Sequence, residues 1–172
     1  MESPLFHSLV DIRQTKAGQS GKSDLVLEKA RWASSIFNRY NRQKTMEIAR
    51  AVSNAAFEMA AEFAQKAVEE TGFGVKEHKK IKNEMASRYL FDYYSDQDYI
   101  NPRYNEKKKL IEIPRPAGVI FALIPSTNPI ATLNYKIILA LLTRNAIVIS
   151  PHPAAQVSSV EAVQRLIAVA ES

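Results

Sequence analysis

The chain has 172 residues, 46% of them hydrophobic and 24% charged, which suffices for a buried core and excludes a mainly disordered protein. Cysteine is absent, so these residues hold no disulfide, no thiolate metal site and no cysteine nucleophile. The net charge of +5 is mild, and the one dense basic run, residues 107–109, contains no aromatic residue, so we expect no nucleic-acid partner. The longest apolar run, residues 117–124, is too short to span a bilayer, which favours a cytoplasmic protein without membrane contact.

The N-terminal part of the sequence predicts helices. Residues 1–22 show no clear period and are expected to form a weakly ordered lead-in, followed by a helical region over residues 23–98. Ser23 or Asp24 can cap the first helix, because their side-chain oxygens can accept hydrogen bonds from free backbone N–H groups. The apolar stripe of this helix comprises Leu25, Leu27, Ala30, Ala33, Ile36, Phe37 and Tyr40.

Two further helices are expected in this region. Apolar residues recur at helical spacing from Ile48 to Val68 and predict one long amphipathic helix, which Gly72 can end in a left-handed conformation. A third helix is predicted over residues 76–94. Its expected inward residues are Ile81, Met85, Tyr89, Leu90 and Tyr93.

The pattern changes after residue 98. Residues 99–116 include a segment, 110–116, that alternates apolar and polar residues and contains prolines, which is typical of an edge strand or a hairpin arm. Residues 117–124 form a continuous apolar run, as expected of a strand covered on both faces.

Residues 117–172 predict a strand–helix–strand–helix unit. The strand 117–124 is followed by a turn at 125–129 and a helix over 130–142, and a second strand over 146–149 by a helix over 157–170. This order indicates an α/β fold in which two parallel strands begin a doubly wound, Rossmann-like sheet.

Polar residues follow both predicted strands, where open α/β sheets bind their ligands. They are Ser126, Thr127 and Asn128 after the first strand, and Ser150 and His152 after the second. The glycine-rich dinucleotide motif is absent, and so is a Gly-x-Ser-x-Gly nucleophile elbow. The three histidines lack metal-ligand spacing, so we expect no metal site. Turn chemistry alone would also select Ser, Thr, Asn and Pro at these positions.

Three ordered motifs resemble the aldehyde dehydrogenase superfamily, most closely its coenzyme A-acylating branch of acetaldehyde, succinate-semialdehyde and sulfoacetaldehyde dehydrogenases. They are Ala67-Val68-Glu69-Glu70-Thr71-Gly72-Phe73-Gly74, Ile124-Pro125-Ser126-Thr127-Asn128-Pro129 and Arg144-Asn145-Ala146-Ile147-Val148-Ile149-Ser150-Pro151-His152-Pro153. The stretch Ile113-Pro114-Arg115-Pro116-Ala117-Gly118-Val119-Ile120, just before the second motif, shares the resemblance. The resemblance covers about residues 25–172. It identifies the chain as similar to the N-terminal part of such an enzyme, which converts an aldehyde, CoA and NAD(P)⁺ to acyl-CoA and NAD(P)H.

The resemblance implies roles for the two turns. Residues 124–127, namely Ile124, Pro125, Ser126 and Thr127, would line the nicotinamide end of NAD or NADP, and Ser150 and His152 would face the adenosine ribose. Thr127 or Asn128 would donate a hydrogen bond to the oxyanion. Counting back from Asn145 places Thr127 at the family's donor position and Asn128 one residue later, so either residue could donate.

The family reacts through a cysteine that is not among these residues. We therefore expect a truncated, Rossmann-like half that is inactive alone and binds nucleotide weakly. The unpaired sheet and the arm at 99–116, similar to the family's oligomerisation strands, predict a homo-oligomer or a complex with a second polypeptide. One piece of a split enzyme, a non-catalytic nucleotide-binding or assembly module, and a basic nucleic-acid-binding protein are the alternatives.

Overall fold

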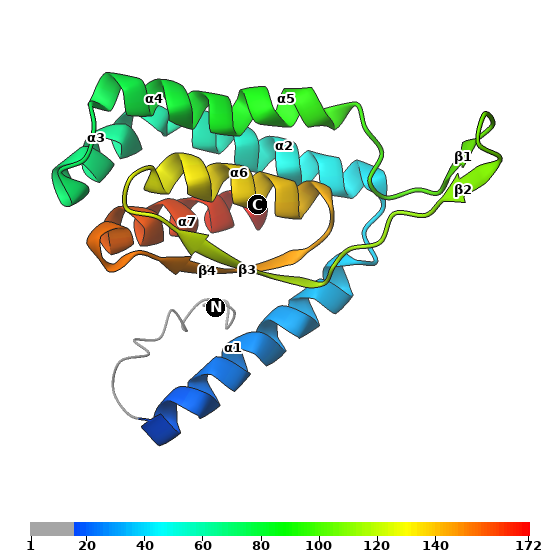
Figure 1. Ribbon diagram of the computed structural model, residues 1–172, viewed down its shortest axis with the longest axis horizontal. Coiled ribbons are helices and arrows are strands. Elements are labelled where there is room, and N and C mark those ends of the chain that lie inside the picture. Colours follow the sequence, from blue (N-terminus) through cyan, green and yellow to red (C-terminus); the bar gives the residue numbers. More distant parts are fainter. Residues whose placement is uncertain (1–15) are drawn as a thin grey trace.

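The computed structural model describes residues 16–172, which form a mixed helix and strand fold with a small parallel sheet (Figure 1). In chain order the elements are α1 (Lys16–Phe37), α2 (Arg42–Glu58), α3 (Ala60–Thr71), α4 (Lys76–Glu84), the π-helical turn Met85–Tyr89, α5 (Leu90–Ser95), β1 (Arg103–Asn105), β2 (Leu110–Glu112), β3 (Val119–Ile124), α6 (Pro129–Leu142), β4 (Ala146–Pro151), a 3-10 turn (Pro153–Ala155) and α7 (Gln156–Ala170).

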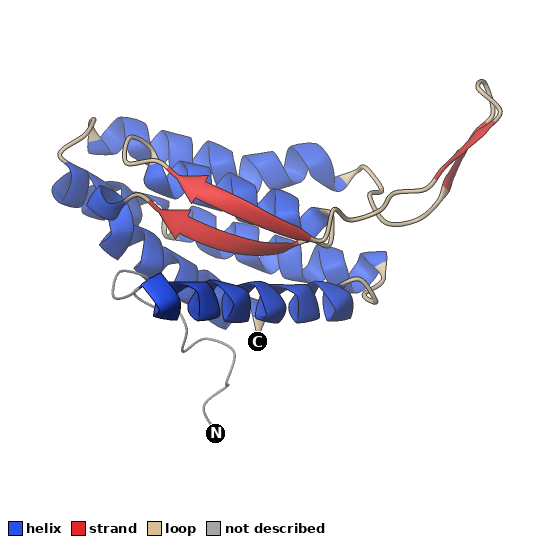
Figure 2. Cartoon of the chain, turned by 60° about the horizontal axis from the view of Figure 1, so that its bottom comes forward, coloured by secondary structure: helices blue, strands red, loops and turns tan. Residues whose placement is uncertain are grey.

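The parallel pair β3–β4 lies between two layers of helices. Helices α6 and α7 cover one face, and α2 and α3 pack behind them, while α1 lies on the other side of the sheet and contacts mainly β4 (Figures 1 and 2). The main core lies between the sheet and α2, α3, α6 and α7, and its most buried members include Val52, Phe63, Ile124, Leu133 and Leu166. The predicted strand–helix–strand–helix unit is confirmed.

The beginning of the chain differs from the sequence prediction. Most of the predicted lead-in, residues 1–15, lies outside the described residues, but α1 already begins at Lys16. A cap at Ser23 or Asp24 is therefore wrong, because both residues lie inside the helix. Leu25 and Leu27, which were expected to face inward, are exposed.

The predicted long helix over residues 48–68 is two helices in the structure. Helix α2 begins after Asn41, whose side chain accepts a hydrogen bond from the N–H of Lys44 at 2.9 Å, and a break at Met59 separates it from α3. The apolar stripe continues across the break, so its inward direction was correct. Gly72 ends α3 with φ of +70°, which confirms the predicted stop and explains the glycine.

The third predicted helix packs with the opposite face inward. Its buried row is Lys79, Asn83, Ser87 and Phe91, whereas four of the residues expected to be buried are exposed: Ile81, Met85, Tyr89 and Tyr93. Polar groups can occupy the buried side because each finds a partner: Asn83 donates to the carbonyl of Ala60, and Ser87 donates to the carbonyl of Asn83.

Both rows of this helix repeat every four residues, a spacing that a regular α-helix does not keep on one face. Each step of four residues advances the row by about 40° around an α-helix. The wider π-helical turn Met85–Tyr89 sets the row back, so the polar row stays inward and the apolar row stays outward from α4 to α5.

Side chains from the segment Arg144–Pro153 and from α3 join the helices to the sheet. Arg144, with φ of +54°, donates from its guanidinium to the carbonyls of Asn38 and Tyr40 after α1. Asn145 accepts from the N–H of Gly118 at 2.8 Å, immediately before β3. Glu70 accepts from the N–H groups of residues 157 and 158 at the start of α7. The carboxylate thus caps α7, and its negative charge interacts favourably with the partial positive charge at the amino-terminal end of that helix.

The arm predicted over residues 99–116 is an antiparallel hairpin that projects from the body (Figure 1). Strand β1 pairs with β2 in the register Tyr104↔Ile111, and the prediction of an edge strand or hairpin arm is confirmed. Its apolar side chains Tyr104, Leu110 and Ile111 are exposed. Among the described residues, no helix is long and apolar enough to cross a membrane.

We predict that the two faces of α5 differ sharply in their contribution to stability. Phe91 is 0% exposed, so Phe91→Ala should lower the free energy of unfolding by about 3–5 kcal/mol. Tyr93 is 75% exposed, so Tyr93→Ala should change it by about 0.5 kcal/mol or less. Urea unfolding of the two variants checks this, and a loss for Tyr93→Ala as large as that for Phe91→Ala would contradict the prediction.

Candidate functional site

The carboxyl ends of the two parallel strands lie side by side, as the sequence predicted. The register pairs Leu123 with Ser150 and Ile124 with Pro151, and the N–H of His152 donates to the carbonyl of Ile124 at 2.8 Å. The turn at 125–128 and the turn at 150–153 are therefore neighbours at one edge of the sheet. The side chain of Ile124 is buried in the core, so only its backbone contributes to this edge.

Two lysines of α4 hold the first turn in place. The ammonium group of Lys79 donates to the backbone carbonyl of Thr127 at 2.6 Å, and that of Lys82 donates to Oδ1 of Asn128 at 3.1 Å. Sequence reasoning missed both residues, because a lysine-rich helix segment is usually a solvated face. The signal in the sequence was the four-residue spacing of Lys79, Asn83 and Ser87, which places these three residues in the buried row of the helix.

The surroundings of this turn are electropositive. Lys79 is only 5% exposed, and no ion pair joins it to a carboxylate within the described part of the chain. Its burial, together with the nearby charge of Lys82, lowers the pKa of the Lys79 ammonium group. Helix α6 begins at the same turn, with Asn128 before Pro129, and its amino-terminal end adds partial positive charge.

The second turn presents a histidine with one ring nitrogen already used. Nδ1 of His152 accepts from the N–H of Ala154 at 3.1 Å, which leaves Nε2 as the nitrogen that can contact a ligand. Ser150 is partly buried on the same face of the sheet as Leu123. The nearby start of α7 is already capped by Glu70, so it does not offer free N–H groups of residues 157 and 158 to an anion.

The site offers hydrogen-bond donors and positive charge but no nucleophile of the expected kind. Ser126, Thr127 and Asn128 supply hydroxyl and amide groups to the turn, and the chain contains no cysteine. Within residues 16–172, no group of histidine and acidic side chains could hold a metal ion. The arrangement can bind and polarise an oxygen atom, and it presents no thiol for covalent attack on a carbonyl.

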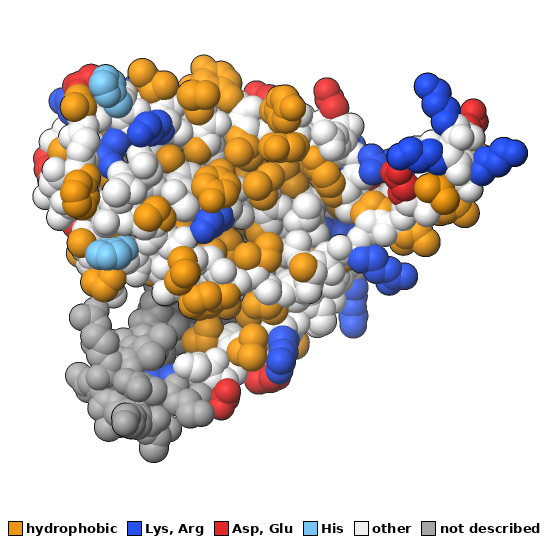
Figure 3. All heavy atoms as spheres, in the orientation of Figure 1, with side chains coloured by type: hydrophobic (Ala, Val, Ile, Leu, Met, Phe, Trp, Pro, Cys, Tyr) orange, Lys and Arg blue, Asp and Glu red, His pale blue; other side chains and the backbone are white. Residues whose placement is uncertain are grey.

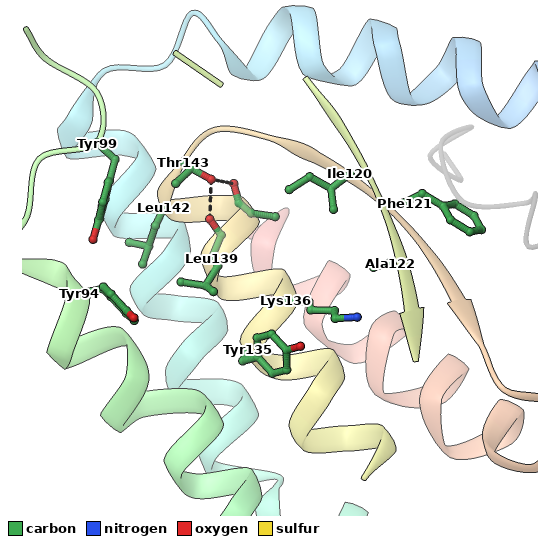
Figure 4. Close-up of a pocket in the computed structure, with 11 residues that line it drawn as sticks. Tyr94, Tyr99, Ile120, Phe121, Ala122, Tyr135, Lys136, Leu139, Leu142 and Thr143 are labelled. Atoms are coloured by element: carbon green, nitrogen blue, oxygen red, sulfur yellow. Dashed lines mark hydrogen bonds between the residues drawn. The ribbon is translucent and has the colours of Figure 1, made fainter. Parts of the chain in front are cut away.

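A hollow in the described structure lies away from these turns. It has a volume of about 420 Å³ and is bounded by α5, α6 and the beginning of β3. Figure 4 shows Tyr94 and Tyr99 on one side, Tyr135 and Leu139 from α6, and Ile120 from β3. Its lining is mostly apolar, which suits an apolar side chain or segment better than a nucleotide.

Comparison with known proteins identifies the family. The profile described as "Aldehyde dehydrogenase family" matches residues 8–171. The chain belongs to the aldehyde dehydrogenase family. It is 37% identical over 145 residues to an aldehyde-alcohol dehydrogenase of Clostridium acetobutylicum, a match that covers 84% of this chain and 17% of that protein. It is 30% identical over 140 residues to a succinate-semialdehyde dehydrogenase (acetylating) of Clostridium kluyveri, with 81% and 31% covered.

Solved structures agree with the acylating resemblance. An acetylating aldehyde dehydrogenase from Geobacillus thermoglucosidasius superposes with a TM-score of 0.85 at 35% identity, covering 92% of this chain and 35% of that one. A propionaldehyde dehydrogenase from Rhodopseudomonas palustris with bound CoA gives a TM-score of 0.68 at 28% identity, covering 85% and 34%. The chain thus spans about one third or less of the length of these aldehyde dehydrogenases.

We predict that Lys79 makes the free energy of unfolding depend on pH in the alkaline range. Its pKa is lower in the folded protein than in the unfolded chain, so between the two values the unfolded chain holds more protons. The free energy of unfolding should therefore rise with pH in a window just below the ordinary lysine value of 10.5. Urea unfolding at several pH values should show this slope in the wild type relative to Lys79→Met. Parallel pH profiles for the two proteins would contradict the prediction.

Proposed function

We propose that the chain is the N-terminal portion of a CoA-acylating aldehyde dehydrogenase that converts an aldehyde, CoA and NAD(P)⁺ to acyl-CoA and NAD(P)H. The observation that carries the proposal is the polar turn 125–128 at the carboxyl end of β3. It lies in a fold that superposes on an acetylating aldehyde dehydrogenase with a TM-score of 0.85. Acylating relatives with named substrates, and a solved relative with bound CoA, support the acyl-transfer chemistry.

The proposal gives the two turns the roles that the resemblance implies. Pro125, Ser126 and Thr127, with the backbone of Ile124, would contact the nicotinamide end of NAD(P). Ser150 and His152 would face the adenosine ribose. Support comes from the closeness of the two turns, joined by the bond from His152 N–H to the Ile124 carbonyl, and from the unused Nε2 of His152. One nucleotide could therefore contact both turns.

The residues of this chain would orient the aldehyde and stabilise negative charge on its oxygen. When bound, NAD(P)⁺ accepts the hydride. Thr127 or Asn128 would donate a hydrogen bond to the oxygen as it gains charge, and Lys79, Lys82 and the start of α6 would strengthen that donation through their positive field. The thiol that attacks the carbonyl would come from polypeptide outside these residues, because the chain contains no cysteine.

We also propose that the chain associates with itself or with a second polypeptide through its apolar surface. Phe121 and Leu123 on β3 are 66% and 64% exposed, although the sequence pattern is that of a strand buried on both faces. In the described sheet β3 has a neighbour only in β4. Along a parallel strand the backbone N–H and C=O groups of successive residues point alternately to one neighbour and to the other. The carbonyls of residues 118 and 124 point toward β4. The backbone groups of residues 119, 121 and 123 therefore face the other edge.

Two more apolar features continue from this edge. The hollow of about 420 Å³ adjoins β3, and the row of Met85, Tyr89 and Tyr93 on the helices above is exposed. Figure 3 shows hydrophobic side chains gathered over this side of the molecule. An apolar surface of this extent, beside a free strand edge, is typical of an interface rather than of a solvated surface. The projecting β1–β2 hairpin, with Leu110 and Ile111 exposed, is a second candidate for pairing between subunits.

We expect the purified chain to form no NADH or NADPH from acetaldehyde and CoA, because hydrogen-bond donors cannot replace the covalent thiol step. The measurement is absorbance at the reduced-nicotinamide band, with a no-protein blank. A related acylating aldehyde dehydrogenase serves as the positive control. Cofactor reduction by this chain above the blank would disprove the need for an external thiol.

We expect light scattering at low micromolar concentration to give a mass well above the 19.3 kDa of one chain. A double variant, Phe121→Lys with Leu123→Lys, should shift the mass toward that of the monomer, because it places charges beside the free edge of β3. Val157→Lys is the matched control, since Val157 is exposed at 71% but lies on α7. A monodisperse wild-type monomer with a cooperative melt would contradict the proposed association.

A further inference from the structure

The turn that follows β3 contains two candidate oxyanion donors, and its contacts with α4 distinguish between them. Lys82 contacts the side-chain carboxamide of Asn128 at 3.1 Å. An ammonium group can only donate, so the atom facing Lys82 must be the carboxamide oxygen. The Nδ2 group, on the other side of the carboxamide carbon, is then directed away from Lys82. No described residue accepts a hydrogen bond from it.

Lys79 fixes the peptide that precedes this side chain. Its ammonium group donates to the Thr127 carbonyl at 2.6 Å, and the described backbone contains no cis peptide bond. In a trans peptide the carbonyl and the following N–H point in opposite directions. The N–H of Asn128 therefore points away from Lys79, and no described residue accepts from it. Asn128 thus has a backbone donor and a side-chain donor whose orientations are each set by one lysine.

The hydroxyl of Thr127 is not held in this way. Thr127 is exposed, and within the described residues its Oγ1 has no hydrogen-bond partner. Its carbonyl, and not its side chain, is the group that α4 engages. A donor that must be ordered during the reaction contributes less than one already oriented, because ordering a side chain costs conformational entropy. This difference favours Asn128 over Thr127.

The position of Lys79 is itself restricted. The side chain is buried beneath the loop after α3, where an added Cβ at Gly74 would lie 3.3 Å from Cε of Lys79. Gly74 has φ of +78°, a conformation that suits glycine. The loop at Gly74 can therefore lie close against the lysine stem. No other side chain in the described structure donates to the Thr127 carbonyl.

We propose that Lys79 and Lys82 are positioning residues that select Asn128 as the oxyanion donor, Lys79 by orienting the Thr127–Asn128 peptide and Lys82 by directing the amide nitrogen outward. The selection of a donor rests on the proposed function, but the positioning itself is a property of the folded chain. It can therefore be tested without turnover, by the nuclear magnetic resonance signals of Asn128.

The test uses the ¹⁵N-labelled full chain, in which the side-chain amide signal of Asn128 is assigned by its loss in Asn128→Asp. In Lys82→Met this signal should shift toward the position of free asparagine side chains, because the carboxamide oxygen loses a hydrogen bond from a charged donor. Lys82→Arg should retain the wild-type signal. Lys80→Met is the matched control, because Lys80 lies on the same helix and pairs with Glu84 instead.

A second variant tests the peptide orientation. Lys79→Met should shift the backbone amide signal of Asn128, and Lys79→Arg should restore it in part. Because Lys79 is buried, the circular dichroism and melt of its variants are recorded first, and the exposed Lys82 variants carry the test if Lys79→Met unfolds. An Asn128 side-chain signal unchanged in Lys82→Met would overturn the proposal. Cofactor reduction assays test the proposed function, whereas the Asn128 signals test the positioning by the two lysines. A failure of one proposal is therefore distinguishable from a failure of the other.

Discussion

The register of the parallel pair β3–β4 is the constraint on which the rest of the structure depends. Ile124 lies opposite Pro151, and the His152 N–H bond to the Ile124 carbonyl closes the ladder at its carboxyl end. A shift by one residue would turn Ala122 and Ile124 away from the core and would break the hydrogen bond that joins the two polar turns. The same register directs Ile147 and Ile149 toward the helices. Core packing and the candidate site therefore follow from one strand pairing.

The N-terminal helices stabilise this pairing from outside the sheet. Arg144 and Asn145 follow α6, and their bonds join the beginning of β4 to the segment after α1 and to the residue before β3. On the other side, Glu62 of α3 accepts two hydrogen bonds from Arg165 of α7. Arg165, together with Lys66, lowers the pKa of that carboxyl group. The helical region thus orients the two-stranded unit and supplies the lysines that hold its first turn.

The sequence was sufficient to predict the elements in which the spacing of apolar residues matches the side that is buried. The strand–helix–strand–helix unit, the Gly72 stop and the closeness of the two turns were all correct, because apolar runs and turn residues have direct physical causes. The third helix was wrong for an equally physical reason. Its pattern places Ile81 and Tyr93 on an apolar face, and an apolar helix face is normally buried against the rest of the same chain. The structure instead buries Lys79 and Asn83, whose partners come from distant segments that no local pattern contains.

The helical segment from α4 to α5, which buries its polar row, connects the proposed association with the proposed positioning of Asn128. Burying the polar row places an ammonium group against the Thr127 carbonyl, and the same choice leaves Met85, Tyr89 and Tyr93 exposed. Turning the apolar row inward would remove both lysines from the turn, and it would leave the Thr127 carbonyl and the Asn128 carboxamide without these partners. The exposed apolar row is therefore the structural consequence of positioning the turn. Covering that row with another polypeptide would bury apolar area and so stabilise the orientation of α4 that holds Asn128.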